Sequence, residues 1–387
     1  MQPLVSKPKY NVIGPLLLAM LVLLPTTTIF EYLKLAVVLV LAFLCNVDDK
    51  GVIRFRYNSY VLIWVINIFL SVIFVFIVDR TINFGRVIHE IERVLFYALL
   101  IYCCKHYRVK RSLLSWICKI LLIINLTIQL AQYFELFETY DFLRNNYIER
   151  GGKTTHLDLA YSGRSSFRSG AIFINPNVYM LFPIVFLIVF LYDSIKTKSI
   201  VPYLWMILSA VSIFLTGSRT GLVLFVAIYA VFIIINRKNM WKNLLILVVG
   251  LVGLYVIFSV LGGSFDSRIF DLNTEDSFGI KVQGLFGYLD MSNPVCWIFG
   301  SVSSNIAVHI DMEIGYIIAW FGIIGLYWYF SLIKDLGARA TEGNKFFYRA
   351  IQILVLVNSV SSSAILNMSF FPFLCLMAFT TICEKEI

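Results

Sequence analysis

Three arginines stand where the chain meets the ends of long apolar runs, and their side chains suit the binding of an anion. Arg219 lies in the short sequence Thr-Gly-Ser-Arg-Thr-Gly, between the apolar runs 200–215 and 222–235, and Arg164 and Arg168 precede a third run. An arginine near hydrocarbon is costly without an anionic partner, and its guanidinium group can bind phosphate oxygens in pairs. Contact with lipid phosphates explains each arginine alone. Three at one boundary favour a dedicated phosphate site.

Two carboxylates begin a further apolar run and could perform acid–base chemistry. Asp311 and Glu313 open the run 311–333, and His309 lies two residues before Asp311. A carboxylate can act as a general base that takes a proton from a hydroxyl group. A helix that begins here explains both residues equally well, with Asp311 as its cap and Glu313 in its first turn.

The run that follows Arg168 begins with Asn175-Pro176-Asn177. Asn175 as a cap and Pro176 at the first helical position account for this sequence structurally. The functional interpretation adds that the N-terminus of such a helix favours a bound anion, which places Asn177 among the candidate ligands.

A fourth charged group lies within an apolar run. His89, Glu90, Glu92 and Arg93 fall in the first turns of the run 87–104. Their spacing allows pairing within one helix at i,i+3 and i,i+4, and this structural explanation is favoured. A share in the site formed by the arginines is the alternative.

The composition indicates the elements that position these residues. Hydrophobic residues make up 59% of the 387 positions and charged residues only 14%, and the mean hydropathy is +0.83. A soluble protein could not bury so much apolar surface, so we expect an all-α, polytopic integral membrane protein with one membrane domain, 1–387. Apolar runs of roughly 17–25 residues predict about twelve transmembrane helices. They lie near 11–29, 32–46, 60–79, 87–104, 113–134, 176–193, 200–216, 219–236, 242–261, 311–333, 346–362 and 366–383.

Basic residues orient the predicted helices. They gather in the segments near 7–9, 50–56, 105–111, 196–198, 237–242 and 334–345, which alternate with the apolar runs so as to share one face. By the positive-inside rule that face is cytoplasmic and carries both termini. The net charge of +9 then reflects orientation and contact with anionic lipids, and no motif for a nucleic-acid partner is present. The first run has no small-residue cleavage site and is expected to be a retained span.

Two predicted connections on the external face are long, 135–174 and 262–310. Connections of this length without obvious strands are usually functional or disordered. The stretch 277–289 in the second loop has the pattern of an amphipathic helix that lies flat at the membrane interface, and it contains Lys281. Of the seven cysteines only Cys296 lies in an external segment, so no external disulfide is expected, and no metal-ligand spacing is present.

The ordered motifs resemble a known superfamily. Arg168-Ser169-Gly170, Asn175-Pro176-Asn177, Gly217-Ser218-Arg219-Thr220-Gly221, and Asp311-Met312-Glu313 leading to Gly322-Ile323-Ile324-Gly325 are similar to those of the O-antigen polymerase and ligase superfamily, from about residue 11 to 380. The resemblance implies a bacterial inner-membrane glycosyltransferase that uses undecaprenyl-diphosphate-linked sugars, without nucleotide sugar, metal or cofactor. It also implies that Arg168 and Arg219 hold the donor diphosphate.

One position separates the two branches of this superfamily. The ligase branch has a catalytic histidine eleven residues before the first glycine of the Gly-x-x-Gly pair, where this chain has Asp311, and His309 lies two residues out of register. The pattern therefore favours a polymerase (Wzy-type) with Asp311 or Glu313 as the base. Polymerases often have an arginine in the amphipathic helix, where this chain has Lys281. Arg164, Asn177 and Lys281 would then position sugar or phosphate.

Three alternatives stay open at this point. A ligase would transfer a finished glycan to another acceptor, a transporter or flippase would move the glycan, and a non-catalytic assembly partner would tolerate loss of the arginines. The chain shows no convincing internal repeat of the kind transporters carry. The expected partners are lipid-linked oligosaccharide donor and acceptor, membrane lipids and a possible chain-length regulator protein.

Overall fold

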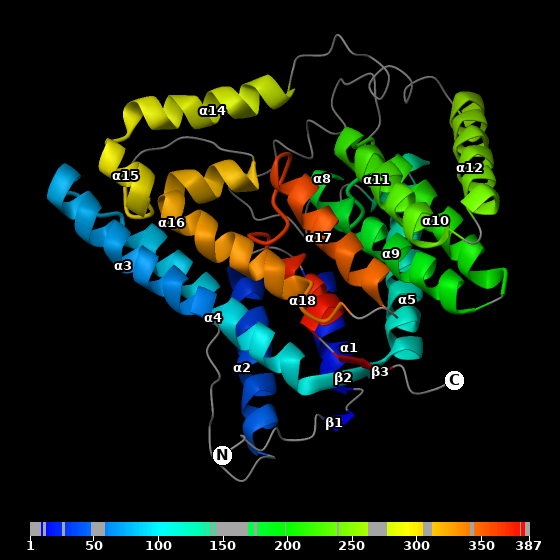
Figure 1. Ribbon diagram of the computed structural model, residues 1–387, viewed down its shortest axis with the longest axis horizontal. Coiled ribbons are helices and arrows are strands. Elements are labelled where there is room, and N and C mark those ends of the chain that lie inside the picture. The colour runs from blue at the N-terminus through cyan, green and yellow to red at the C-terminus, as the bar shows by residue number, and fades with distance from the viewer. Residues whose placement is uncertain are drawn as a thin grey trace.

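A computed structural model shows a mainly helical protein (Figure 1). It describes residues 9–10, 13–24, 28–47, 59–134, 136–139, 142–143, 169–173, 176–197, 199–237, 240–261, 277–304, 312–340, 344–379 and 381–383. Most of the predicted loop 135–174 lies outside these ranges.

Each of the twelve predicted apolar runs coincides with helix. The first matches α1 (Ile13–Met20) with the short helix η1 (Leu21–Leu23), and the sixth matches α8 (Pro176–Tyr179) with α9 (Leu181–Lys196). The others match α2 (Thr28–Val47), α3 (Ser59–Asp79), α4 (Phe84–His106), α5 (Arg111–Tyr133), α10 (Val201–Leu215), α11 (Arg219–Ile235), α12 (Met240–Leu261), α16 (Glu313–Leu336), α17 (Lys345–Ser359) and α18 (Phe371–Phe379).

Four stretches of the described chain are long and apolar enough to cross a membrane. They are Ser59–Val78, Arg111–Tyr133, Pro176–Lys196 and Glu313–Leu336. The chain is therefore a helical membrane protein, and the total of twelve crossings stays a prediction.

Two helices form the centre of the bundle. Every residue from Leu181 to Asp193 in α9, and from Phe371 to Phe379 in α18, is buried. Both helices are apolar on all sides, which suits a helix surrounded by protein. Asn367 caps the turn that leads into α18: its side chain accepts hydrogen bonds from the backbone N–H groups of Ser369 and Phe370, both 3.0 Å.

Three short strands, which the sequence did not predict, join distant parts of the chain. β1 (Lys9–Tyr10) pairs in parallel with β2 (Tyr107–Lys110), which pairs in parallel with β3 (Thr381–Cys383). The predicted run 366–383 is too long, since the helix ends at Phe379 and the chain then extends along β2. The strands bring segments near both ends of the chain to one end of the bundle (Figure 1).

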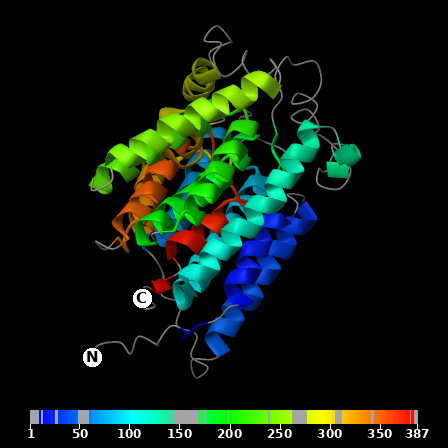
Figure 2. The same ribbon diagram turned by 90° about the vertical axis from the view of Figure 1, so that its right-hand side faces the viewer.

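Basic residues gather at this same end, where ion pairs tie helix ends together. Arg111 at the start of α5 binds Asp193 near the end of α9 at 2.6 Å, and Lys105 near the end of α4 binds Asp335 near the end of α16 at 2.8 Å. The helices run side by side in a common slanted direction between this end and the opposite one (Figure 2). This arrangement agrees with the prediction that basic residues share one face of the bundle. The assignment of that face to the cytoplasm stays a prediction.

The opposite end carries α14 (Ser277–Met291), which lies across the bundle (Figure 1). It covers the stretch 277–289 in which a helix was expected. The short helix α15 (Pro294–Phe299) follows, with Asn293 as its cap and Pro294 in its first position.

The chain after α15 enters the bundle, although it belongs to the predicted external loop 262–310. Asn67 donates to the carbonyl of Phe299 at 3.0 Å, and the backbone N–H of Val302 donates to Ser71 at 2.9 Å. Asn67 and Ser71 lie inside the apolar span Ser59–Val78. Non-helical backbone at this depth needs such partners, because hydrocarbon offers none.

Gly322 breaks α16 where α15 packs against it. Its backbone has φ 65°, and a Cβ atom there would lie 2.4 Å from the carbonyl oxygen of Ile298. Only glycine fits both constraints. The break sets the first part of α16, which carries Glu313, at an angle to the remainder (Figure 1).

Candidate functional site

Arg219 is the first residue of α11 and follows a three-residue turn. Gly217 has φ 57°, the Thr216 hydroxyl accepts from the backbone N–H of Ser218 at 3.2 Å, and the Ser218 side chain caps α11 by accepting from Gly221 at 3.3 Å. Arg219 is half-buried. An arginine at a helix N-terminus combines two features that attract anions.

This turn lies at the end of the bundle opposite the strands. α5 starts beside β2 and rises about 35 Å over its 23 residues. Near its far end Gln129 donates to the carbonyl of Ser212 at 3.1 Å, one turn before α10 ends. Arg219 is therefore separated from the basic end by the length of the bundle.

Asn177 contacts the Arg219 turn directly. The Ser218 hydroxyl donates to the side-chain oxygen of Asn177 at 3.2 Å. Pro176 is the first residue of α8, as predicted, and Asn175 lies outside the described residues. Two motifs about forty residues apart in the sequence thus meet at two helix N-termini.

The segment that carries Arg168 is anchored to the same turn. Arg168 itself lies outside the described residues, but the backbone N–H of its neighbour Ser169 donates to the carbonyl of Leu215 at 3.0 Å. The Ser169 hydroxyl also donates to Gln132, and Gln132 donates to the carbonyl of Ala171 at 3.0 Å. These bonds hold the chain after Arg168 beside the turn that carries Arg219.

Lys281 reaches the site from α14. Its ammonium donates to the backbone carbonyl of Ser361, and the Ser361 hydroxyl lies 2.5 Å from the hydroxyl of Thr220. The contact joins α14 and the segment after α17 to the residue next to Arg219. Arg219, Asn177 and Lys281 are therefore all linked through Ser218, Thr220 and Ser361 into one group, the anion cluster.

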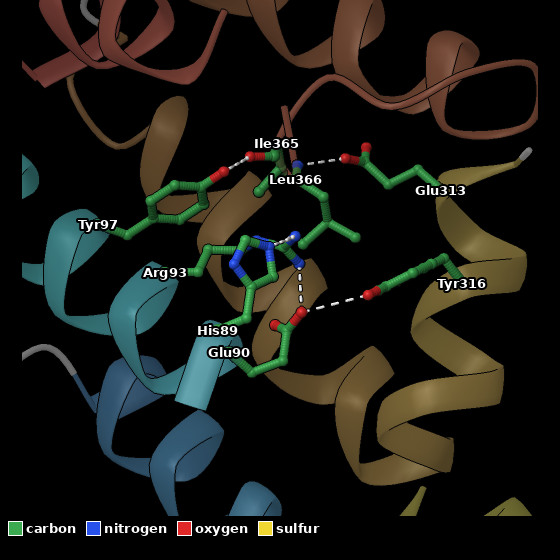
Figure 3. A network of polar contacts seen from close by, with 8 residues as sticks. All are labelled: His89, Glu90, Arg93, Tyr97, Glu313, Tyr316, Ile365 and Leu366. Carbon is green, nitrogen blue, oxygen red and sulfur yellow. Dashed lines mark hydrogen bonds and ion pairs between the residues drawn. The ribbon is translucent and has the colours of Figure 1, made fainter. Parts of the chain in front are cut away.

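Glu313 is held by the fold. It is 1% exposed, and its two carboxylate oxygens accept from the backbone N–H of Leu366 at 2.6 Å and from the Tyr329 hydroxyl at 2.8 Å. Figure 3 shows the first of these bonds. Each oxygen accepts one hydrogen bond from the fold, so Glu313 positions the start of α16, and Asp311 and Glu313 both stay predicted as the base.

The remaining predicted site residues lie outside the described part of the chain. They are Arg164, His309 and Asp311, in addition to Arg168. Met312, next to Asp311, is described and buried, and Glu313 follows it as the first residue of α16.

Charged residues of α4 pair with one another, as the favoured structural explanation predicts. Arg93 binds Glu90 at 2.7 Å and His89 at 3.3 Å (Figure 3). Tyr316 of α16 donates to the same oxygen of Glu90 at 3.2 Å. The buried pair thus also joins α4 to the first part of α16, close to Glu313.

Neither the protein-family models nor the curated proteins contain a match to this chain. The site is thus interpreted from its own residues. Asn177 bonds to Ser218, and Lys281 is linked through Ser361 to Thr220, so both predicted ligands connect to the residues that flank Arg219. Within the described ranges no group of three or more His, Cys, Asp or Glu side chains is arranged to hold a metal ion.

Sequence reasoning missed the side chains that assemble the anion cluster. Gln129 and Gln132 lie in the apolar run 113–134, and Gln129 accepts from the Ser212 hydroxyl at 2.6 Å. A polar residue in a membrane helix usually faces protein, and this signal could have marked both. Nothing in the sequence pairs Ser361 with Thr220.

We expect Gln132→Leu to weaken the anchor of the Arg168 segment. The change leaves the Ser169 hydroxyl and the Ala171 carbonyl without their partner, at a cost of about 1–3 kcal/mol in unfolding free energy. Denaturant unfolding of the purified variant measures this cost. In a double-mutant cycle with Ser169→Ala, the double variant should lose less unfolding free energy than the sum of the two single losses, and full additivity would contradict the bond.

Proposed function

We propose that this chain is a polymerase that joins undecaprenyl-diphosphate-linked oligosaccharide repeat units into O-antigen or a related surface polysaccharide. The reaction takes place on the external face of the bacterial inner membrane. The observation that carries the proposal is the anion cluster, where the predicted ligands Arg219, Asn177 and Lys281 are linked through three intervening hydroxyl-bearing residues.

The position of the cluster supports a lipid-linked donor. It lies at the end of the bundle opposite the basic end, where positive charge beside helix N-termini favours an anion. A diphosphate on a membrane-embedded lipid would reach helix N-termini at this level, while its glycan extends away from the membrane.

The chemistry follows from the groups present. A hydroxyl of the acceptor glycan attacks the anomeric carbon of the donor, the bond from that carbon to the diphosphate oxygen breaks, and undecaprenyl diphosphate leaves. Negative charge grows on the leaving oxygen, and Arg219 with Arg168 would stabilise it. Asp311 would accept the proton of the attacking hydroxyl.

The broken α16 supports this assignment of roles. Glu313 ties the start of α16 to Leu366, and Tyr316 ties it to Glu90 of α4. These bonds fix the helix start two residues after Asp311. A base needs such positioning, because a small displacement lowers the rate steeply.

Deletion of the gene in its source bacterium tests the proposal against ligation. Loss of a polymerase leaves single repeat units attached to the lipid core, whereas loss of a ligase leaves the core bare. Gel separation of the surface glycolipids distinguishes these outcomes. An unchanged distribution of chain lengths would contradict both activities.

A further inference from the structure

A cavity lies apart from the anion cluster, toward the same end of the bundle. It has a volume of about 190 Å³, lies between α2 and α4, and is lined mainly by Glu31, Tyr32, His89, Glu92, Phe96 and Met368. α4 ends beside β2, so His89 and Glu92 in its first turns lie toward the end away from the strands.

One non-helical segment connects this cavity to the anion cluster. The segment 360–370, between α17 and α18, carries Ser361 at its start, which contacts Thr220 and Lys281. Met368 near its end lines the cavity, and Ser369 accepts from Lys34 of α2 at 3.5 Å. Between the two, Leu366 is bound by Glu313. Glu313 is thus bound to the middle of a segment that contacts the anion cluster at one end and lines the cavity at the other.

The groups that line the cavity suit a neutral polyhydroxyl compound. Glu31 and Glu92 can only accept hydrogen bonds when ionised. Arg93 can only donate, so in its contact with His89 the Nε2 atom is the acceptor. The two carboxylates therefore offer acceptors to the hydroxyl groups of a sugar, while Tyr32 and Phe96 offer ring surface to its C–H groups.

The charge of the cavity separates it from the anion cluster. Of its described lining residues two are carboxylates, and none is a lysine or arginine. Carboxylates repel a diphosphate, and a hydroxyl-rich ligand meets no such penalty.

We propose that this cavity binds a sugar residue of the acceptor glycan. The inference rests on the proposed polymerase function, which needs a place for a second glycan beside the donor. The diphosphate of the donor occupies the anion cluster. The segment 360–370 fixes the position of the two sites relative to each other and to Glu313.

Binding of two separate probes tests this proposal. The first probe is the oligosaccharide repeat unit released from the surface polysaccharide, free of lipid and phosphate, and the second is undecaprenyl diphosphate. Dissociation constants for both are measured with the purified full-length protein, with Glu92→Gln, with Tyr32→Ala and with Glu138→Gln. Glu138 is an exposed carboxylate after α5 and serves as the matched control.

We expect Glu92→Gln and Tyr32→Ala each to weaken oligosaccharide binding about tenfold, with undecaprenyl diphosphate binding unchanged. Glu138→Gln should change neither constant. The proposal is overturned if the wild-type protein does not bind the oligosaccharide, if the two cavity variants bind it normally, or if they lose both probes together. Failure of the polymerase proposal would give a different result, because Arg219→Ala protein would then still bind undecaprenyl diphosphate normally.

Discussion

Replacing Arg219 with alanine should lower the rate of glycan polymerisation by about 100- to 1,000-fold, the usual effect of removing one group that stabilises a developing anion. The side chain begins α11 beside two helix N-termini, so its loss removes charge from the centre of the anion cluster. The fold should persist, because Ser218 rather than Arg219 caps the helix. The chain-length distribution of surface polysaccharide in a complemented deletion strain measures the effect, with protein quantity checked by immunoblot.

Two variants control this experiment. Arg237 lies just after the other end of α11 and is exposed, so Arg237→Ala removes the same charge at a distance from the site. We expect near-normal polymer from it. Arg219→Lys keeps the charge but loses the paired hydrogen bonds of guanidinium and should restore activity only in part. Undiminished polymer length in Arg219→Ala at normal protein level would rule out the assigned site.

Amide substitutions should separate the two candidate carboxylates, and this is the second large effect. Asp311→Asn removes the proposed base, and we expect a loss of about 100- to 10,000-fold in rate. Glu313→Gln should retain activity within about tenfold. Its amide oxygen can accept from Leu366 while its NH₂ group donates to the Tyr329 oxygen, so both bonds have a replacement.

Glu313 should matter more for the stability of the fold than for the reaction rate. Glu313→Ala leaves the Leu366 N–H and the Tyr329 hydroxyl buried without partners and should lower the unfolding free energy by about 3 kcal/mol. Single-turnover rates and thermal unfolding of the same preparations measure both properties. Inactive Glu313→Gln protein of normal stability, together with active Asp311→Asn protein, would move the base from Asp311 to Glu313.

The helices could be predicted because apolar length is a strong local signal. Arg219 and Pro176 each begin the predicted helix, and His89, Glu90 and Arg93 pair at the expected spacing. Each of these features depends only on neighbours within one or two turns of the chain.

The features that were missed depend on contacts between distant segments. The strands pair Lys9 with Tyr107 and Arg108 with Thr381, and no local pattern specifies such pairing. The chain near Val302 enters the bundle because Asn67 and Ser71 satisfy its backbone, and only the folded arrangement shows these partners. The same holds for Ser361, which joins Lys281 to Thr220.

The most direct test of the central claim is a reaction of the purified protein with undecaprenyl-diphosphate-linked repeat units as the only substrate. Mass spectrometry of the products should show glycans of two or more repeat units on the lipid, with one undecaprenyl diphosphate released for each linkage formed. Arg219→Ala protein should form both products about 100- to 1,000-fold more slowly, and Arg237→Ala protein should form them at a near-normal rate. Intact single units after incubation with folded wild-type protein, with no undecaprenyl diphosphate released, would contradict the account.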